Sequence, residues 1–395
     1  MTASPPRAGT VVRLGVAQTI AWASTYYLPA VLAVPMARTL GIAPTTVFAA
    51  FSVALLVAAA VGPVAGRAID RLGGRPVLAW TAVVLAAGLG LMAVAQGPGT
   101  LWVAWVVLGV GMGTGLYEAA FAALVRLHGH AARGGITGVT LFAGFASTVG
   151  WPLTAWLEST VGWRGACAAW AGLHLLVAVP LYLGLPRVDA ASPPPAAPAP
   201  DPAGERATGR LGTSVALAFV FAATWFISTA MAAHLPRLLQ AGGVAFGTAV
   251  WVGALIGPAQ VAARVLEFSV LRHVHPLLSA RLAAALHPVG AAAFLAAGAP
   301  FAALFGVLHG AGNGIMTIAK GTLPLVFFGP AGYGERQGVL MVPARFAQAA
   351  APWAFGACLD AFGVHALWLT AAVGALAWGV LMGLRAVEAR REATA

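Results

Sequence analysis

The sequence predicts an all-α membrane protein with twelve transmembrane helices in two pseudo-symmetric six-helix bundles. Three observations lead to this fold class. Hydrophobic residues make up 60% of the 395 residues and charged residues only 8%, whereas charged residues form about 25% of a soluble globular protein. The apolar residues occur in runs close to the roughly 20 residues that a helix needs to cross a bilayer. The second half of the chain also repeats features of the first half.

Twelve apolar stretches are long enough to be transmembrane helices. In chain order they are residues 14–37, 47–66, 77–96, 100–124, 135–157, 165–185, 213–235, 247–271, 278–298, 301–325, 338–359 and 365–385. The intervening residues 186–212 are rich in proline, which predicts a solvated, semi-rigid linker rather than a helix. The expected domains are therefore an N-terminal bundle, residues 1–185, and a C-terminal bundle with its tail, residues 213–395.

The basic residues predict the orientation of these helices. The net charge is +11, and most of the arginines lie at the ends of the apolar stretches, on the face that carries both termini and the linker. The positive-inside rule places that face in the cytoplasm. We therefore expect a multi-pass protein of the bacterial cytoplasmic (inner) membrane with both termini and the linker inside. This pattern explains the charge without a nucleic-acid partner.

The two halves of the sequence are related by an offset of about 201 residues. A triplet of glycines at alternate positions in residues 109–113 recurs in residues 310–314, and Pro35 recurs as Pro236. Internal repeats of this kind are typical of transporters built from two related bundles, whose binding site lies at the interface between them. The glycines themselves are expected to allow close packing of helices.

A charged loop separates the second and third apolar stretches and carries the motif Gly66-x-x-x-Asp70-Arg71-x-Gly73-x-Arg75. It resembles the loop between helices 2 and 3 of the major facilitator superfamily, a family of twelve-helix secondary transporters. The resemblance implies that Asp70, Arg71 and Arg75 gate the transporter through a state-dependent charge pair at the cytoplasmic face. Gly66 and Gly73 are expected to allow the close turn. The alternative is an ordinary positively charged cytoplasmic turn.

Four charged residues stand out inside the predicted helices: Glu118, Arg264, Lys320 and Arg345. A charge inside the membrane costs at least a few kcal/mol, so each is a candidate functional residue. Pairing Glu118 with Lys320 or with Arg345 would lower the cost of both charges. Alternatively, long side chains near the helix ends reach the membrane surface and act only as a gate or anchor.

Three further stretches resemble the monocarboxylate porters within that superfamily: residues 133–144, 162–164 and 257–264. In that group the eighth helix carries an aspartate four residues before the arginine that matches Arg264, and Gln260 stands at that position here. The lysine that follows a proline in the first helix of the animal members is replaced by Ala30. The excess of positive charge inside the membrane favours an anionic substrate.

These observations predict a secondary active transporter that works by alternating access, is coupled to protons and moves a small, monocarboxylate-like organic anion. The expected substrate-binding residues lie between the halves: Tyr26, Tyr27, Arg264, Asn313 and Lys320. We expect Glu118 to carry the coupling proton, since it is the carboxylate that lies well inside the membrane. Arg345 is assigned to the gate. We expect the protein to act as a monomer.

Two alternatives remain at this point. Proton-driven efflux of drug-like or toxic compounds would also suit the aromatic residues and the missing porter residues. A membrane enzyme or an assembly scaffold is the other alternative, but the sequence contains no metalloprotease, nucleophile-elbow or nucleotide-binding motif. Cys167 and Cys358 lie singly inside apolar stretches, so no disulfide or metal site is predicted. We expect neither enzymatic activity nor a cofactor.

Overall fold

The computed structural model describes residue 6 and residues 8–187 and 204–384. The first half contains α1 (Ala8–Ser24), α2 (Leu28–Leu40), α3 (Pro44–Leu72), α4 (Gly74–Ala93), α5 (Pro98–Gly115), α6 (Tyr117–His128), η1 (Gly129–Ala132), α7 (Arg133–Ala143), α8 (Ala146–Leu173), η2 (His174–Ala178) and α9 (Val179–Leu183). The second half contains α10 (Gly204–Ala241), α11 (Phe246–Ser269), η3 (Leu271–His273), α12 (Pro276–Ala297), η4 (Ala299–Phe301), α13 (Ala302–Phe328), α14 (Tyr333–Phe362), η5 (Gly363–Ala366) and α15 (Leu367–Gly383). The predicted all-α membrane fold is confirmed.

Eight helical segments in the described residues are long and apolar enough to cross a membrane. The segment 98–183 covers three predicted transmembrane stretches, because the chain turns within η1 and reverses at Gly162, where φ is 70°. A positive φ of this size suits a glycine. The segment 333–383 covers two stretches, and α1 with α2 forms the first. Twelve transmembrane helices are therefore consistent with the structure.

Three of the predicted transmembrane stretches in the first half are interrupted, and the fifth breaks at residues 144–145, between α7 and α8. The first stretch breaks between α1 and α2, at residues 25–27, and the fourth breaks at Leu116, whose ψ of −162° is extended rather than helical. The corresponding stretches of the second half, α10 and α13, run without such a break. The interruptions bring helix ends and polar groups into the middle of the molecule.

The predicted linker lies partly outside the described residues, because residues 188–203 are not among them. Residues 385–395 of the predicted tail also lie outside the described residues. Helix α10 begins at Gly204, inside the stretch 186–212 for which the sequence predicted a linker. The last proline of that stretch is Pro202, and beyond it nothing prevents the backbone from forming a helix. The expectation of a linker as far as residue 212 is therefore wrong for its last part.

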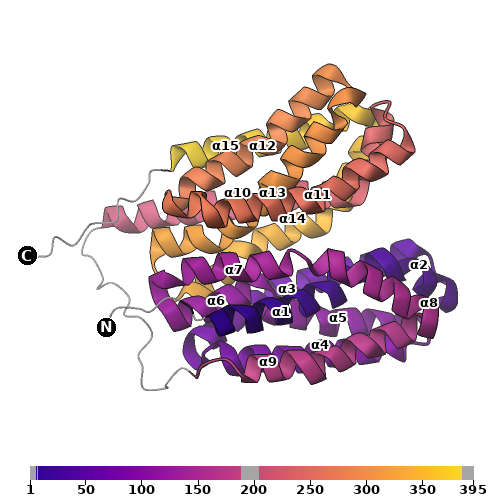
Figure 1. Cartoon of the computed structure of the whole chain (residues 1–395), viewed down its shortest axis with the longest axis vertical. Coiled ribbons are helices and arrows are strands. Elements are labelled where there is room, and N and C mark those ends of the chain that lie inside the picture. Colours follow the sequence, from indigo (N-terminus) through magenta and orange to yellow (C-terminus); the bar gives the residue numbers. More distant parts are fainter. Residues whose placement is uncertain (1–5, 7, 188–203, 385–395) are drawn as a thin grey trace, which may run out of the picture.

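Each half has its own apolar core. One cluster of buried side chains draws on residues 14–185, together with Leu325 and Tyr333, and two further clusters draw only on residues 217–381. The halves lie side by side in Figure 1, with α3, α6 and α7 of the first half against α11, α13 and α14 of the second.

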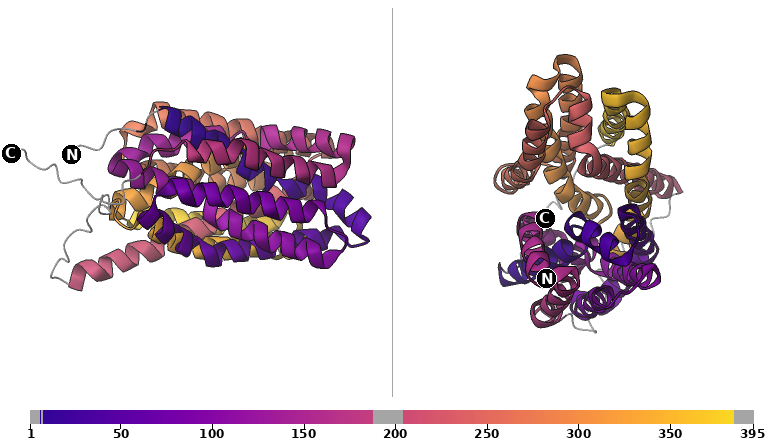
Figure 2. Two further views of the ribbon diagram at one scale, coloured as in Figure 1. Left: turned by 90° about the horizontal axis from the view of Figure 1, so that it is seen from below. Right: turned by 90° about the vertical axis from the view of Figure 1, so that its right-hand side faces the viewer.

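The two ends of the molecule differ in how closely the halves approach each other. We call the end at which α1 begins and α15 ends the termini face, and the end at which α2 ends and α8 reverses the opposite face. The ribbons of the halves lie close together at the termini face and diverge toward the opposite face (Figure 1), and a view from the opposite face shows the halves as an upper and a lower group of helices (Figure 2, right). Contacts between the halves are therefore concentrated on one side.

Candidate functional site: the seam between the halves

The first contact at the termini face joins Asp70 to the start of α14. The two carboxylate oxygens of Asp70 accept hydrogen bonds from the backbone N–H groups of Gly334 and Glu335, each 2.9 Å long. The first amides of a helix have no partner within the helix, and its dipole favours a negative charge there. Arg67 also crosses the seam, with its Nη1 atom 2.9 Å from Oε1 of Glu335. Asp70 therefore latches the two halves together.

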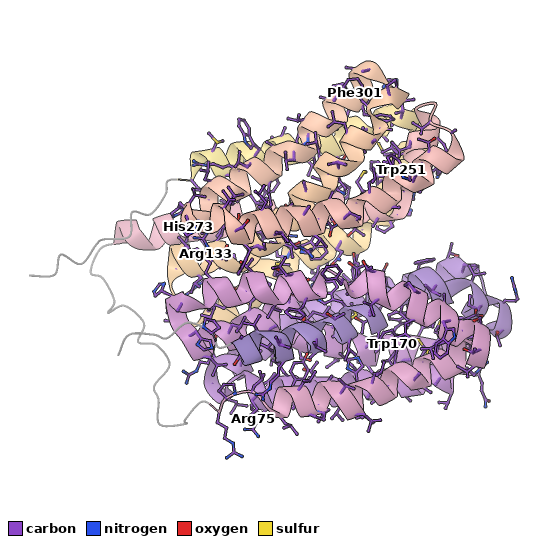
Figure 3. All side chains as sticks on the ribbon, viewed as in Figure 1. Arg75, Arg133, Trp170, Trp251, His273 and Phe301 are labelled. Carbon is purple, nitrogen blue, oxygen red and sulfur yellow. The ribbon has the colours of Figure 1, made fainter. Side chains whose placement is uncertain are left out.

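The other members of the loop motif have different surroundings. Arg71 is exposed, and Figure 3 shows Arg75 extending outward from the first half. Neither forms a hydrogen bond or ion pair with the second half in the part of the chain that the structure describes. Gly73, with φ of 81°, makes the turn from α3 to α4. The predicted pairing of Asp70 with arginine is thus replaced by a bond to a helix N-terminus.

Helices α3 and α14 touch through their backbones beside this latch. A Cβ atom on Gly66 would lie 2.0 Å from the carbonyl oxygen of Gly334, and one on Gly338 would lie 2.6 Å from Cα of Pro63. Such distances are too short for any side chain, so the helices can approach this closely only because glycines occupy the contact. This glycine contact closes the termini face.

A second latch, which the sequence did not predict, is made by Arg133 at the start of α7. Its Nη2 atom donates to the carbonyl oxygens of Leu271 and Val274, at 3.4 and 3.1 Å, and lies 3.6 Å from Oε1 of Glu267. These carbonyls belong to the first residue of η3 and to the residue that follows η3, just beyond the end of α11, where the helix dipole favours a positive charge. Figure 3 shows Arg133 beside His273 across the seam.

The two latches correspond through the repeat. Shifted by the sequence offset of about 201 residues, Arg133 falls on Gly334, whose amide binds Asp70. An acidic side chain binds the beginning of a helix in one latch, and a basic side chain binds the end of a helix in the other. The repeat could have identified Arg133, but the sequence alone does not show which helix end the side chain meets.

Glu118 and Arg345 form an ion pair across the seam. Nη2 of Arg345 lies 3.0 Å from Oε2 of Glu118, and the exposed fractions of the two side chains are 4% and 17%. Of the two partners that the sequence allowed for Glu118, the structure thus selects Arg345 over Lys320. Glu118 lies in the first turn of α6, so the break in the fourth stretch places the positive end of a helix dipole beside its charge.

The ion pair continues into a hydrogen-bonded chain. Nη1 of Arg345 donates to Oε1 of Gln348 at 3.0 Å, and Nε2 of Gln348 donates to the hydroxyl of Tyr26 at 2.9 Å. Tyr26 lies in the break of the first transmembrane stretch, so the chain of bonds returns to the first half. A cavity of about 20 Å³ adjoins Glu118 and Arg345, which is room for one water molecule.

Aromatic rings from both halves gather beside this chain. Trp22 of α1 and Trp225 of α10 lie nearly parallel, with an angle of 7° and 6.3 Å between ring centres. Trp22 also lies 4.8 Å from Tyr117 and 6.4 Å from Tyr27. Trp22, Tyr117 and Gln348 were not among the predicted site residues. Tryptophans and tyrosines in apolar helices are most often packing residues.

Lys320 and Arg264 form no ion pair with a carboxylate of the residues that the structure describes. Nζ of Lys320 lies 4.1 Å from the centre of the Trp225 ring, and no carboxylate of the described residues lies within 4.0 Å of it. Arg264 donates to the carbonyl oxygen of Thr140 across the seam at 3.2 Å, and its Nε atom is buried without a partner. Both side chains are buried, with exposed fractions of 5% and 4%.

Asn313 is the predicted substrate residue that the structure does not bring together with the others. It lines a cavity of about 30 Å³ whose other lining residues all belong to α10, α12, α13 and α15. His287 and His309 also line it, with their Nδ1 atoms 3.0 Å apart. This cavity lies inside the second half and holds about two water molecules at most.

Two six-helix halves that meet at a polar seam, with contacts concentrated at one face, define a multi-pass membrane transporter. The chain belongs to the Major Facilitator Superfamily, whose sequence profile matches residues 14–290. No curated protein sequence matched the chain.

Solved structures of the same fold are similar over nearly the whole chain. The human organic anion transporter MFSD10 (TETRAN) has a TM-score of 0.73 and 19% identity, covering 96% of this chain and 100% of that one. The proton:xylose symporter XylE bound to 6-bromo-6-deoxy-D-glucose has a TM-score of 0.72 and 14% identity, covering 94% and 95%. The E. coli fucose:proton symporter FucP has a TM-score of 0.70 and 14% identity, covering 94% and 97%. These likenesses establish the fold.

Replacing Gly66 by alanine is expected to open the termini face, because the new methyl group would overlap the backbone of Gly334. Spin labels on cysteines introduced at the exposed positions Arg71 and His273, in a background without the native cysteines, would report the distance between the halves by electron paramagnetic resonance. We expect a longer distance in Gly66→Ala. The control is Gly90→Ala on α4, where a Cβ atom meets nothing within 4 Å. An unchanged distance in Gly66→Ala would contradict the role of the glycine contact.

The Glu118–Arg345 pair is expected to be strongly coupled. Removing one partner leaves a buried charge unpaired, which lowers the free energy of unfolding by about 3–5 kcal/mol, whereas removing both partners should cost less than the sum of the two changes. A double-mutant cycle with Glu118→Gln and Arg345→Gln, followed by denaturant unfolding in detergent, measures the coupling. The control is the exposed pair Arg67–Glu335, for which about 0.2–1 kcal/mol is expected. Equal coupling in both cycles would argue against a buried pair.

Proposed function

We propose that this protein is a proton-coupled secondary active transporter that moves a small, monocarboxylate-like organic anion across the cytoplasmic membrane by alternating access. The observation that carries the substrate class is the pair of unneutralised cations, Lys320 and Arg264, in the seam. Because Glu118 is already paired with Arg345, no carboxylate of the described residues remains within 4.0 Å of either cation.

The physical argument is the cost of charge inside a membrane. A lysine or arginine at the centre of a transmembrane helix costs about 2.5–3.5 kcal/mol on an insertion scale. Lys320 recovers part of this cost against the face of Trp225, and Arg264 recovers part against the carbonyl oxygen of Thr140. A bound anion would offset the rest, whereas a neutral sugar would not.

The contacts at the termini face supply a gate for alternating access. The Asp70 latch, the Arg133 latch and the glycine contact all join one half to the other, so rocking of the halves must break all three. With the termini in the cytoplasm, as the positive-inside rule predicts, these three contacts would form the cytoplasmic gate in its closed position. Arg345 would contribute to this gate through its bond to Glu118.

Proton coupling follows from the position of Glu118. Its partner, Arg345, lies in the other half, so separation of the halves at this depth removes the cation that stabilises the carboxylate. A proton can then neutralise Glu118 in place of Arg345. Binding of a proton and closure of the ion pair therefore exclude each other, which links proton movement to the conformational cycle.

The chain is organised as two bundles that together form one site. The separate apolar cores support bundles formed by residues 1–185 and 213–395, although α10 extends the second bundle to Gly204. Each bundle contributes to the seam, so a single chain carries a complete site. We therefore propose a monomer that needs the lipid bilayer, its substrate and protons.

Proton-driven efflux of drug-like or toxic compounds is the second candidate. It is favoured by the aromatic rings of Trp22, Trp225 and Tyr26, which would contact an amphipathic compound. In proteoliposomes with an imposed pH gradient, an importer of anions takes up labelled carboxylate together with protons. An exporter exchanges the compound for protons in the opposite direction.

Neutralising the seam is expected to weaken binding of the anion. Lys320→Met and Arg264→Gln each remove one unpaired cation, and each should lower the affinity for a carboxylate by about tenfold or more, the effect of losing a hydrogen bond to a charged group. Isothermal titration with the purified protein measures the change. Arg237→Gln, on the exposed pair with Asp360, is the control. Undiminished affinity in both seam variants would exclude the proposed anion site.

Replacing Glu118 by glutamine is expected to uncouple transport from protons. The amide cannot take up and release a proton, so uptake driven by a pH gradient should be lost while exchange of labelled for unlabelled substrate continues. Both rates are measured in the same proteoliposomes. Asp360→Asn, on the exposed pair with Arg237, serves as the control. Gradient-driven uptake that persists in Glu118→Gln would assign the proton to another group.

A further inference from the structure

We propose that the substrate is an aromatic carboxylate whose planar ring enters between Trp22 and Trp225 while its carboxylate binds Lys320 and Arg264. This inference rests on the proposed function, because it specifies the body of the anion that the seam carries. It depends on three independent features of the seam: the parallel indoles, their unpartnered N–H groups and the position of the cations beside ring faces.

The two indoles form a slot that opens and closes with the halves. Trp22 belongs to the first half and Trp225 to the second, and their rings are parallel to within 7°, with centres 6.3 Å apart. A flat group between two parallel rings lies about 3.5 Å from each, so the two indole planes must be about 7 Å apart to hold one. Because Trp22 and Trp225 belong to different halves, separation of the halves moves the two rings apart, and a planar ring would then enter between them.

The indole N–H groups of both tryptophans lack acceptors. Nε1 of Trp22 and Nε1 of Trp225 are buried and form no hydrogen bond within the described residues. Buried donors without acceptors are rare in proteins, and leaving one unpaired costs about 1–3 kcal/mol. Oxygen atoms on the ligand would satisfy them. An aliphatic compound without oxygens at its end could not.

The cations lie where the charged end of such a ligand would be. Nζ of Lys320 is 4.1 Å from the centre of the Trp225 ring, so its positive charge lies directly beside one of the two indoles that would stack on the ligand. Arg264 reaches across the seam to the carbonyl oxygen of Thr140 at 3.2 Å, and the Tyr117 ring of the first half lies 4.8 Å from Trp22. The seam thus holds both the cations and the aromatic rings.

This combination separates the aromatic acid from other ligands. A short aliphatic acid would neutralise the cations but leave the ring faces without a stacking partner. A neutral aromatic compound would stack but leave both cations uncompensated. An aromatic amine would add a third positive charge. An aromatic carboxylate satisfies the rings, the cations and the unpartnered donors together.

Matched ligands test this inference on the purified full-length protein. Benzoate and cyclohexanecarboxylate carry the same charge on rings of similar size, but only benzoate is flat, and benzamide is flat without the charge. Titration calorimetry should show benzoate binding about tenfold or more tightly than cyclohexanecarboxylate, because stacking adds to the burial of apolar area. Benzamide should bind more weakly than either acid.

The failures of this inference and of the proposed function are distinguishable. Equal affinity for the two acids, with benzamide weaker, would overturn the aromatic inference and leave the anion transporter standing. Benzamide or benzylamine binding more tightly than both acids would overturn the proposed function together with the inference.

Variants of Trp225 test the slot directly. Trp225→Phe keeps a flat face and should preserve most of the preference for benzoate over cyclohexanecarboxylate, whereas Trp225→Leu should reduce that ratio to about one. The ratio is measured within one preparation, so a lower yield of folded protein does not change it. Trp251→Leu, at a side chain that is 56% exposed near the opposite face (Figure 3), is the matched control. A full preference in Trp225→Leu would overturn the inference.

Discussion

The need to neutralise charge inside a membrane is the constraint on which the arrangement of the seam depends. Lipid supplies neither counter-ions nor hydrogen bonds, so every charged side chain within the helices must find its partner in the protein or in a ligand. Glu118 and Arg345 satisfy each other, but only because the two halves meet. Lys320 and Arg264 are left with partial substitutes, an aromatic face and a carbonyl oxygen. The same constraint therefore holds the halves together and reserves a place for an anion.

The fold could be predicted from the sequence because its signals are long-range and redundant. Runs of apolar residues, the basic residues at their ends and the repeated glycines and prolines all indicate two six-helix halves. The start of α10 at Gly204 was missed because residues 186–212 were treated as one proline-rich stretch. The residues after Pro202 contain no proline and form a helix. The break at residues 25–27 was missed although Pro29, in the first turn of α2, favours the start of a new helix there. The break at Leu116 was missed because no proline marks it.

The site was predicted only in part, and the reason is geometric. The cost of charge identified Glu118, Arg264, Lys320 and Arg345, all of which lie in the seam. Asn313 was placed wrongly relative to them, because a polar residue in the tenth stretch can face either the other half or the interior of its own bundle. Periodicity alone does not decide between these faces. The sequence indicated the side chain of one latch, Asp70, but not the groups that it binds. Those groups are backbone atoms at a helix end, and no residue type marks them.

The glycine contact between α3 and α14 has a consequence for how this protein tolerates change. At Gly66 and Gly334 the two helices meet through backbone atoms, so the closeness of their approach is set by the absence of a side chain at these two positions. No compensating replacement is available, because alanine is the smallest alternative and already too large. Substitutions should therefore be tolerated at lipid-facing and loop positions, whereas the glycines of this contact should tolerate none.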